Sequence, residues 1–516
     1  MKKLLSVLLA AVMLLAMAGV AMADLTGDLT VIGLENGEQV TIYQIIGYDE
    51  VGGQAAGTTW MGSLADWAKS MNGDAELAPG KVPSGMSEAE FYNQMIAQVH
   101  GGNAGVLTKS ENATSGSASF AGIPAGSYLV EISGGVNIHR ANVVSLTVGE
   151  NNTDVASATL DVAKENKMSK PTIEKDIDRD NFTFDETVTF TITANVPKYP
   201  EGATNTIFKI GDRMDECLTL VAGTVKVYKN SKSDANLLTE NTDYTITYPG
   251  TSGSFLTGTG IEGDNRNKKE IFEIDFSNSY ARVKEYETIV VEYQAKVTDT
   301  TILGVDTNNN QAILTYTNAP FGENGYKEEQ DIENLYTYGI QVTKQNENNE
   351  LLEGAEFTLT YNNQRLTFKS VNGVYEPTGY TDKDYDRENA DNNTDIVLKT
   401  NAQGKIEIKG LRAGTYTLTE KLAPIMDANT GKRYRILKPE TTIVIEQATD
   451  HKYVKDQEGN DTRLVNASAT VTNYTSILPI TGGMGTTIFM VAGIAVMACA
   501  VVALMVVLKR QKHSEG

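Results

Sequence analysis

Short segments that alternate apolar and polar residues recur along most of the chain. Alternation with a period of two is typical of β-strands that bury one face, and turn-forming residues at short intervals between such strands are typical of β-sandwiches. The clearest segments are residues 40–46, 128–132, 143–148, 187–196, 270–276, 288–297, 311–318, 336–345 and 467–475. We therefore predict a mainly β protein built from tandem immunoglobulin-like β-sandwich domains.

One segment follows a helical period instead. Within residues 87–100, Phe91 and Met95 lie on one apolar stripe, and Ser87 begins the segment in a capping-box pattern. We predict a small helix in the first domain. Core packing is the better interpretation of its stripe than a cofactor site.

The two ends of the chain carry export patterns. Two lysines, an apolar run and the small-residue end Ala21-Met22-Ala23 are typical of a secretory signal peptide. Near the C-terminus, an apolar run long enough to span a bilayer is followed at once by Lys509 and Arg510. The positive-inside rule places these cations in the cytoplasm, so the middle of the chain is expected outside the cell.

The length of 516 residues is too great for a single core, so we divide the chain into several parts. The signal peptide takes residues 1–23, and an N-terminal domain takes residues 24–165. A second sandwich takes residues 166–332 and a third takes residues 333–475. Residues 476–516 hold the C-terminal signal, the transmembrane segment and the basic tail.

Composition and charge exclude several classes of function. The formal net charge of -22 argues against nucleic acid and anionic lipid as partners. Cys217 has no disulfide partner in the folded part of the chain, because Cys499 lies in the apolar tail. The four histidines have no metal-ligand spacing, and neither a phosphate loop nor a nucleophile elbow is present. We predict no metal, no cofactor and no enzyme of an ordinary kind.

Strand alternation places charged residues on apolar faces. Lys344 shares a face with Ile340 and Val342, although burying an unpaired ammonium group is costly. The same alternation predicts two inward-facing sets, each with a lysine, a carboxylic acid and an asparagine. They are Lys175, Asp212 and Asn310 or Asn318 in the second domain, and Lys344, Glu420 and Asn473 in the third.

Two interpretations fit these sets. Residues at strand ends can turn their side chains out to solvent. Alternatively, burial lowers the pKa of a lysine and raises that of a carboxylic acid, and a neutral amine beside a carboxamide is a nucleophile facing an electrophile. A protonated acid can stabilise the developing oxyanion, and loss of ammonia then leaves a Lys–Asn isopeptide bond. Two parallel sets favour this second interpretation, in which paired first and last strands are tied together.

The motifs around these sets resemble those of sortase-assembled pilins of Gram-positive bacteria. "GLRAGTYTLTEKLAP" (410–424) resembles the E-box of a collagen-adhesin B-type (Cna-B) domain, and "KPTIEKDI" (170–177) resembles the start of a fimbrial D2 domain. The resemblance implies two isopeptide bonds, each with a catalytic acid. They are Lys175–Asn310 with Asp212, and Lys344–Asn473 with Glu420.

The segment "LPITGG" resembles the LPxTG sorting signal, through Leu478, Pro479, Ile480, Thr481 and Gly482. The resemblance implies that sortase cleaves after Thr481 and links its carbonyl group to an amine. It further implies a secreted protein anchored to peptidoglycan on the surface of a Gram-positive bacterium.

Polymerisation needs an acceptor lysine, which in shaft pilins lies in a "YPKN"-like motif just before the D2 domain. The corresponding segment here, "LDVAKENKMSK", lacks the tyrosine and the proline of that motif. Lys164 is the first candidate for the inter-subunit acceptor and Lys167 is the second.

The resulting hypothesis is a structural subunit of a covalently polymerised pilus; the alternative is a wall-anchored monomeric adhesin or minor pilin that binds a host ligand. Only residues 474–477 separate Asn473 from Leu478. A lone adhesin needs a long linker to project from the wall, so the short spacer favours the shaft subunit. The implied partners are sortase, identical subunits, peptidoglycan, minor pilins and a host ligand.

The first domain is expected to lack an isopeptide bond. The first lysine of the mature chain is Lys69, so the early strands offer no amine. Glu131 alternates with Tyr128, Val130 and Ile132, and it is therefore expected to face solvent. This domain should be the least stable of the three.

Overall fold

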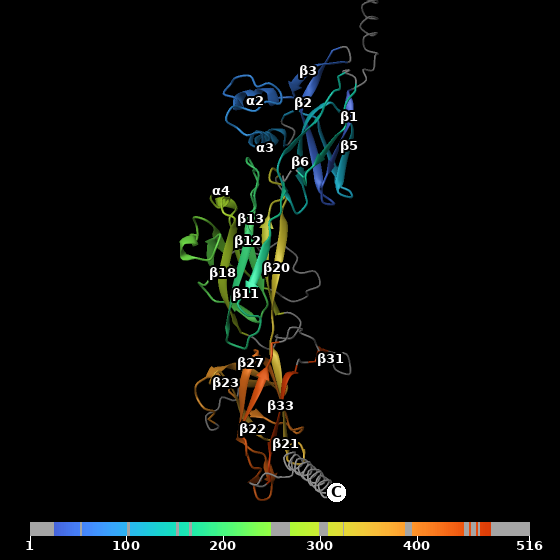
Figure 1. Ribbon diagram of the computed structural model, residues 1–516. Coiled ribbons are helices and arrows are strands. Elements are labelled where there is room, and N and C mark those ends of the chain that lie inside the picture. Colours follow the sequence, from blue (N-terminus) through green and yellow to red (C-terminus); the bar gives the residue numbers. More distant parts are fainter. Residues whose placement is uncertain are drawn as a thin grey trace, which may run out of the picture.

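The computed structural model shows three β-sandwiches arranged end to end, in chain order (Figure 1). The mainly β prediction is confirmed, and a few short helices accompany the strands. The exact domain boundaries given above stay a prediction. The structure describes residues 25–51, 54–100, 104–150, 154–164, 168–248, 269–298, 308–322, 325–386, 395–447, 454–455, 461–462 and 465–475.

The first sandwich contains two main sheets. One has the order β5-β1-β9, with bounds Ser117–Pro124, Thr26–Ile32 and Ala158–Asp161, and β1 and β9 run parallel. The other has the order β3-β2-β6-β8, with β4 also paired to β2. Its bounds are Gln54–Trp60, Gln39–Val51, Gly126–Ser133, Asn142–Leu146 and Thr108–Asn112.

Helices cover the second face of this larger sheet. The predicted helix is confirmed as α3 (Glu88–Val99), and the Ser87 side chain caps it by accepting from the Glu90 N–H. The sequence analysis missed α2 (Leu64–Met71), which packs with α3 in one apolar cluster. That cluster includes Tyr43 and Leu129 from the sheet, so both faces of β2 and β6 are buried.

The second sandwich packs two five-stranded sheets around one core. The first has the order β11-β12-β18-β14, with β15 also paired to β18. Its bounds are Ile173–Ile177, Thr187–Asn195, Thr288–Val297, Leu218–Leu220 and Lys226–Lys229. The second has the order β16-β17-β13-β19-β20, with bounds Thr245–Thr247, Lys269–Asp275, Phe208–Met214, Asn308–Tyr316 and Lys327–Leu335. A one-turn helix, α4 (Tyr280–Val283), adds to its core.

The third sandwich is a continuous sheet folded around its own core. Its order is β30-β27-β22-β23-β24-β26-β21-β33, with β25 also paired to β22. The bounds are Glu440–Ile445, Gly414–Leu422, Glu356–Tyr361, Gln364–Val371, Val374–Thr381, Lys405–Leu411, Tyr338–Asn346, Val465–Asn473 and Leu398–Lys399. The small ladders elsewhere in the chain are β7-β10 (Ile138–His139, Met168–Ser169), β28-β29 (Ile425–Asp427, Lys432–Arg433) and β31-β32 (Val454–Lys455, Asp461–Thr462).

The first and second sandwiches share contacts at their junction. The Tyr316 hydroxyl donates to the Val136 carbonyl at 2.6 Å, and the Asn318 amide donates to the Gly135 carbonyl at 2.6 Å. Phe321, which follows β19, is buried in the apolar cluster of α2 and α3. The segment after β19 therefore anchors the second sandwich to the first.

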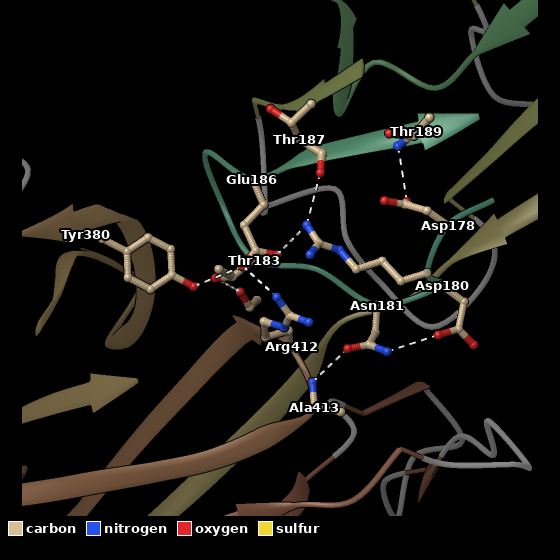
Figure 2. Close-up of polar contacts among 12 residues, drawn as sticks. Asp178, Asp180, Asn181, Thr183, Glu186, Thr187, Thr189, Tyr380, Arg412 and Ala413 are labelled. Atoms are coloured by element: carbon tan, nitrogen blue, oxygen red, sulfur yellow. Dashed lines mark hydrogen bonds and ion pairs between the residues drawn. The ribbon is translucent and has the colours of Figure 1, made fainter. Parts of the chain in front are cut away.

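A polar network joins the second sandwich to the third (Figure 2). Glu186 accepts from the Arg412 guanidinium at 3.1 Å and from the Tyr380 hydroxyl at 3.2 Å. Nearby, the Thr183 hydroxyl donates to the Gly410 carbonyl at 2.7 Å. These partly buried groups are therefore paired across the junction, and they connect the two sandwiches directly.

No helix among the described residues is long and apolar enough to cross a membrane. The predicted signal peptide and the predicted transmembrane segment lie outside the described residues.

Candidate functional site

The second sandwich brings Lys175, Asp212 and Asn310 together in its core. They come from β11, β13 and β19, and each side chain is essentially inaccessible to solvent. The Lys175 Nζ donates to Asp212 Oδ2 at 2.5 Å. Alternation along the three strands places these polar residues among apolar neighbours, since each strand has one face in the core.

Tyr293 on β18 completes this group, and the sequence analysis gave it no role. Its hydroxyl accepts from Lys175 Nζ at 2.6 Å and from Asn310 Nδ2 at 2.6 Å, and it donates to Asp212 Oδ2 at 2.7 Å. Alternation does place Tyr293 on the inward face. An inward tyrosine is ordinary in a core, however, so the strand pattern carries no further signal.

The third sandwich brings Lys344, Glu420 and Asn473 together from β21, β27 and β33. The Lys344 Nζ donates to Glu420 Oε2 at 2.9 Å, and the Asn473 Nδ2 donates to the same oxygen at 3.0 Å. All three side chains are buried. The strand-end interpretation, with side chains turned to solvent, is therefore wrong for both sets.

Burial shifts the pKa values in both sites toward the neutral forms. Loss of hydration lowers the pKa of the Lys175 and Lys344 amines, although the neighbouring carboxyl groups oppose this. Loss of hydration likewise raises the pKa of Asp212 and Glu420, although the lysines oppose this. The amine thus stays neutral down to a lower pH than usual, and the acid stays protonated up to a higher pH. The pH range in which the amine is neutral therefore moves toward the range in which the acid is neutral.

Each site also holds a pair of buried oxygens that have no hydrogen-bond partner among the residues that the structure describes. They are Asp212 Oδ1 and Asn310 Oδ1 in the second sandwich, and Glu420 Oε1 and Asn473 Oδ1 in the third. Burying an unpaired acceptor is costly, and a protonated acid turns one of each pair into a donor. The arrangement can thus present a neutral amine, a carboxamide and a proton donor to the amide oxygen.

The strands that carry these sets are connected differently in the two sandwiches. In the third, β21 and β33 are parallel neighbours, as expected for paired first and last strands. In the second, that expectation is wrong: β11 pairs with β12 in one sheet, while β19 lies in the other. The set of Lys175, Asp212 and Asn310 therefore spans two sheets, with β11 in one and β13 and β19 in the other. The backbone N–H of Lys175 donates to the Asp331 side chain on β20, which also lies in the other sheet.

The structure separates the alternative asparagine from the second site. Asn318, the other asparagine on the inward face, reaches the junction with the first sandwich. Asn310 is thus the asparagine that lies beside Lys175, through the Tyr293 hydroxyl.

Lys164 follows β9 and is 84% exposed, with its Nζ 3.2 Å from Asp161 Oδ2. This side chain is accessible to another protein. Lys167 lies outside the described residues, and so do Leu478, Pro479, Ile480, Thr481 and Gly482.

Glu131 in the first sandwich is buried, so the expectation that it faces solvent is wrong. The Tyr43 hydroxyl donates to it at 2.9 Å, and His100 Nε2 lies 3.4 Å away. Alternation correctly sets Glu131 opposite Val130, but α2 and α3 cover its face as well. Among the described residues, its polar partners include no lysine, so the group lacks a nucleophilic amine.

We expect the first sandwich to open before the other two, because its buried acid has no lysine among its described polar partners and an isopeptide bond is expected only in the second and third sandwiches. Hydrogen exchange of the folded ectodomain, followed by mass spectrometry, should show the fastest exchange in β1, β2 and β6 among the core strands. Exchange in β21 and β33 should be slowest. Equal protection of all three sandwiches would contradict the expected order of stability.

The fold and the two buried sets define a class: a tandem β-sandwich protein of extended shape with a lysine, an acid and an asparagine in the cores of two domains. Residues 338–460 match the family described as SpaA, a prealbumin-like fold domain. No curated protein matches the chain.

Solved structures of Gram-positive pilins match most of the chain. The T6 backbone pilin of Streptococcus pyogenes is 17% identical, covers 87% of this chain and 98% of its own, and gives a TM-score of 0.52. The major pilin SpaD of Corynebacterium diphtheriae is 19% identical, with 87% and 98% coverage and a TM-score of 0.46. The major pilin BcpA of Bacillus cereus is 15% identical, with 87% and 100% coverage and a TM-score of 0.40. The first of these matches shows that the chain shares the fold of the T6 backbone pilin.

Proposed function

We propose that this chain is the repeating structural subunit of a covalently polymerised surface pilus, stabilised by two self-formed Lys–Asn isopeptide bonds. The observation that carries the proposal is the pair of buried sets, in which each lysine contacts its acid directly. The fold shared with the T6 backbone pilin, a modular three-domain protein, supports the role of subunit.

In each site the lysine Nζ attacks the asparagine Cγ. The Nζ–Cγ bond forms, the Cγ–Nδ2 bond breaks, and the departing nitrogen leaves as ammonia after taking one proton that the amine releases. Asp212 or Glu420, protonated at the start, donates a hydrogen bond to the amide oxygen while negative charge develops there, and it is unchanged at the end. The reaction consumes the buried amine, so it removes the cost of burying a charge.

Polymerisation uses a different bond. Sortase breaks the Thr481–Gly482 peptide bond and transfers the Thr481 acyl group to an amine, and Gly482 leaves with the rest of the tail. Lys164 of the neighbouring subunit is the proposed acceptor, supported by its 84% exposure. The last subunit of the polymer is transferred to peptidoglycan, which places the pilus on the wall of a Gram-positive bacterium.

The alternative is a wall-anchored monomeric adhesin or minor pilin. The short spacer between Asn473 and Leu478 supports the shaft subunit instead, because it gives a single molecule little reach from the wall. The extended arrangement of the sandwiches suits a subunit that gains reach from its neighbours (Figure 1).

The test is an SDS immunoblot of wall extracts from native cells. The wild-type protein should give a ladder of SDS-resistant polymers, because its subunits are joined by amide bonds. Thr481→Ala should abolish the ladder and release the protein from the wall, since it alters the residue whose acyl group is transferred. A single wall-linked band from the wild type would reject the shaft role in favour of the monomeric alternative.

A further inference from the structure

The Tyr293 hydroxyl lies between the two nitrogen atoms that exchange places in the second site. It contacts Lys175 Nζ, the attacking nitrogen, at 2.6 Å and Asn310 Nδ2, the departing nitrogen, at 2.6 Å. Its own proton is donated to Asp212 Oδ2 at 2.7 Å. The oxygen thus accepts two hydrogen bonds and donates one, which uses its full capacity.

Among the described residues, the third site has no hydroxyl in this position, and it reaches both nitrogens in another way. Glu420 Oε2 lies 2.9 Å from Lys344 Nζ and 3.0 Å from Asn473 Nδ2, so one carboxyl oxygen bridges the two. Aspartate is one methylene shorter than glutamate. Asp212 Oδ2 contacts Lys175 Nζ, but its link to Asn310 Nδ2 passes through the Tyr293 hydroxyl. The tyrosine supplies the reach that the shorter acid lacks.

We propose that Tyr293 is a catalytic residue of the second site, where its hydroxyl relays a proton from the attacking nitrogen to the departing nitrogen. This inference rests on the proposed isopeptide chemistry, and it assigns the two sandwiches different proton paths. In the third sandwich, Glu420 accepts the Nζ proton on Oε2 as its Oε1 proton moves to the amide oxygen. It then passes the Oε2 proton to Nδ2 and recovers the Oε1 proton as the amide carbonyl re-forms, so the carboxyl group stays neutral.

The relay balances without another reactant. Attack of neutral Nζ on Cγ leaves a positive charge on Nζ and gives Nδ2 a lone pair, because amide conjugation is lost. Nζ passes one proton to the Tyr293 oxygen while the hydroxyl proton turns from Asp212 Oδ2 to Nδ2, whose new lone pair accepts it. The Cγ–Nδ2 bond then breaks, ammonia leaves, and both Tyr293 and Asp212 are regenerated.

The surroundings keep the hydroxyl protonated and fixed. Burial raises the pKa of Tyr293 well above its usual value, so the group enters the reaction as a neutral phenol. Its ring stacks on Phe190 with centroids 5.4 Å apart, and it forms a T-shaped pair with Phe272 with centroids 5.1 Å apart. These contacts hold the ring itself, so Tyr293→Phe removes the hydroxyl and keeps most of the packing.

The experiment follows both bonds in the same full ectodomain. Freshly synthesised wild-type, Tyr293→Phe and Tyr280→Phe proteins are sampled over time, and peptide mapping quantifies the Lys175–Asn310 and Lys344–Asn473 products separately. Tyr280→Phe is the matched control, because it also removes a buried hydroxyl of the second sandwich, one that donates to the Pro197 carbonyl. The rate of bond formation in the third sandwich serves as the internal reference.

Tyr293→Phe should slow the Lys175–Asn310 bond by about 100-fold or more and leave the Lys344–Asn473 bond unchanged. Tyr280→Phe should leave both rates unchanged. Adding Asp212→Glu to Tyr293→Phe should recover much of the lost rate, since it recreates the set of the third site.

The proposal is overturned if Tyr293→Phe forms the Lys175–Asn310 bond at the wild-type rate, or if Tyr280→Phe slows it equally. If the double variant forms the Lys175–Asn310 bond no faster than Tyr293→Phe alone, the idea that the tyrosine compensates for the shorter aspartate is rejected. A wild-type protein that forms neither bond would instead refute the proposed isopeptide chemistry, so the two failures are distinguishable.

Discussion

The Glu420→Ala variant is expected to retain one ammonia molecule that the wild type loses, and to unfold at a temperature lower by about 10–20 °C in its third sandwich. Asp212→Ala should do the same in the second. A cross-link over such a long loop stabilises a domain by about 4 kcal/mol if it acts as a disulfide does, mainly by constraining the unfolded chain. The measurements are intact mass and calorimetry of the ectodomain.

The mass change identifies the cause of the lower stability. Without Glu420, Lys344 and Asn473 lose the group that holds both nitrogens, and the amide oxygen loses its proton donor. The bond does not form, so the ammonia stays in the protein.

Glu376→Ala is the matched control, because Glu376 is a fully buried carboxylate of the same sandwich that pairs with Lys409 at 2.8 Å. This variant should lower stability through the lost ion pair and still show the full loss of ammonia. Loss of the cross-link in Glu376→Ala as well would contradict a specific role for Glu420.

The Lys164→Ala variant is expected to collapse the SDS-resistant ladder to a monomer that remains linked to the wall. Lys164 is 84% exposed and follows β9 of the first sandwich, so the proposed acceptor amine is accessible without any unfolding. The Thr481 acyl group can still be transferred to peptidoglycan, which is why the monomer stays attached. The readout is an immunoblot of wall extracts.

Lys170→Ala provides the control for this second variant. Lys170 lies close in sequence, is 50% exposed and pairs loosely with Glu329 at 3.7 Å. Its loss should leave the ladder intact. A ladder that survives Lys164→Ala would reject Lys164 and direct attention to Lys167.

Strand alternation predicted which residues lie inside the second and third sandwiches, because the direction of a side chain on a strand is a local property. Lys175, Asp212, Lys344, Glu420 and Asn473 all face a core, as the sequence indicated. Alternation also placed Glu131 correctly opposite Val130. It could not show that α2 and α3 cover that second face, because the burial of a face depends on distant elements.

The pairing of β21 with β33 was expected from the sequence, but the other contacts between strands could not be predicted, for the same reason. The position of β11 and β19 in opposite sheets depends on how the whole sandwich closes. The position of Tyr293 depends on contacts with residues of three other strands, and Phe321 reaches the core of another domain. Each of these features joins residues far apart in the chain, where the local pattern carries no information.

The intact mass of the wild-type ectodomain, purified after folding, tests the central claim most directly. The account predicts a mass lower than that of the plain sequence by two ammonia molecules, with cross-linked peptides joining Lys175 to Asn310 and Lys344 to Asn473. A mass equal to that of the plain sequence would contradict it, because both buried amines would then have remained unreacted beside their acids.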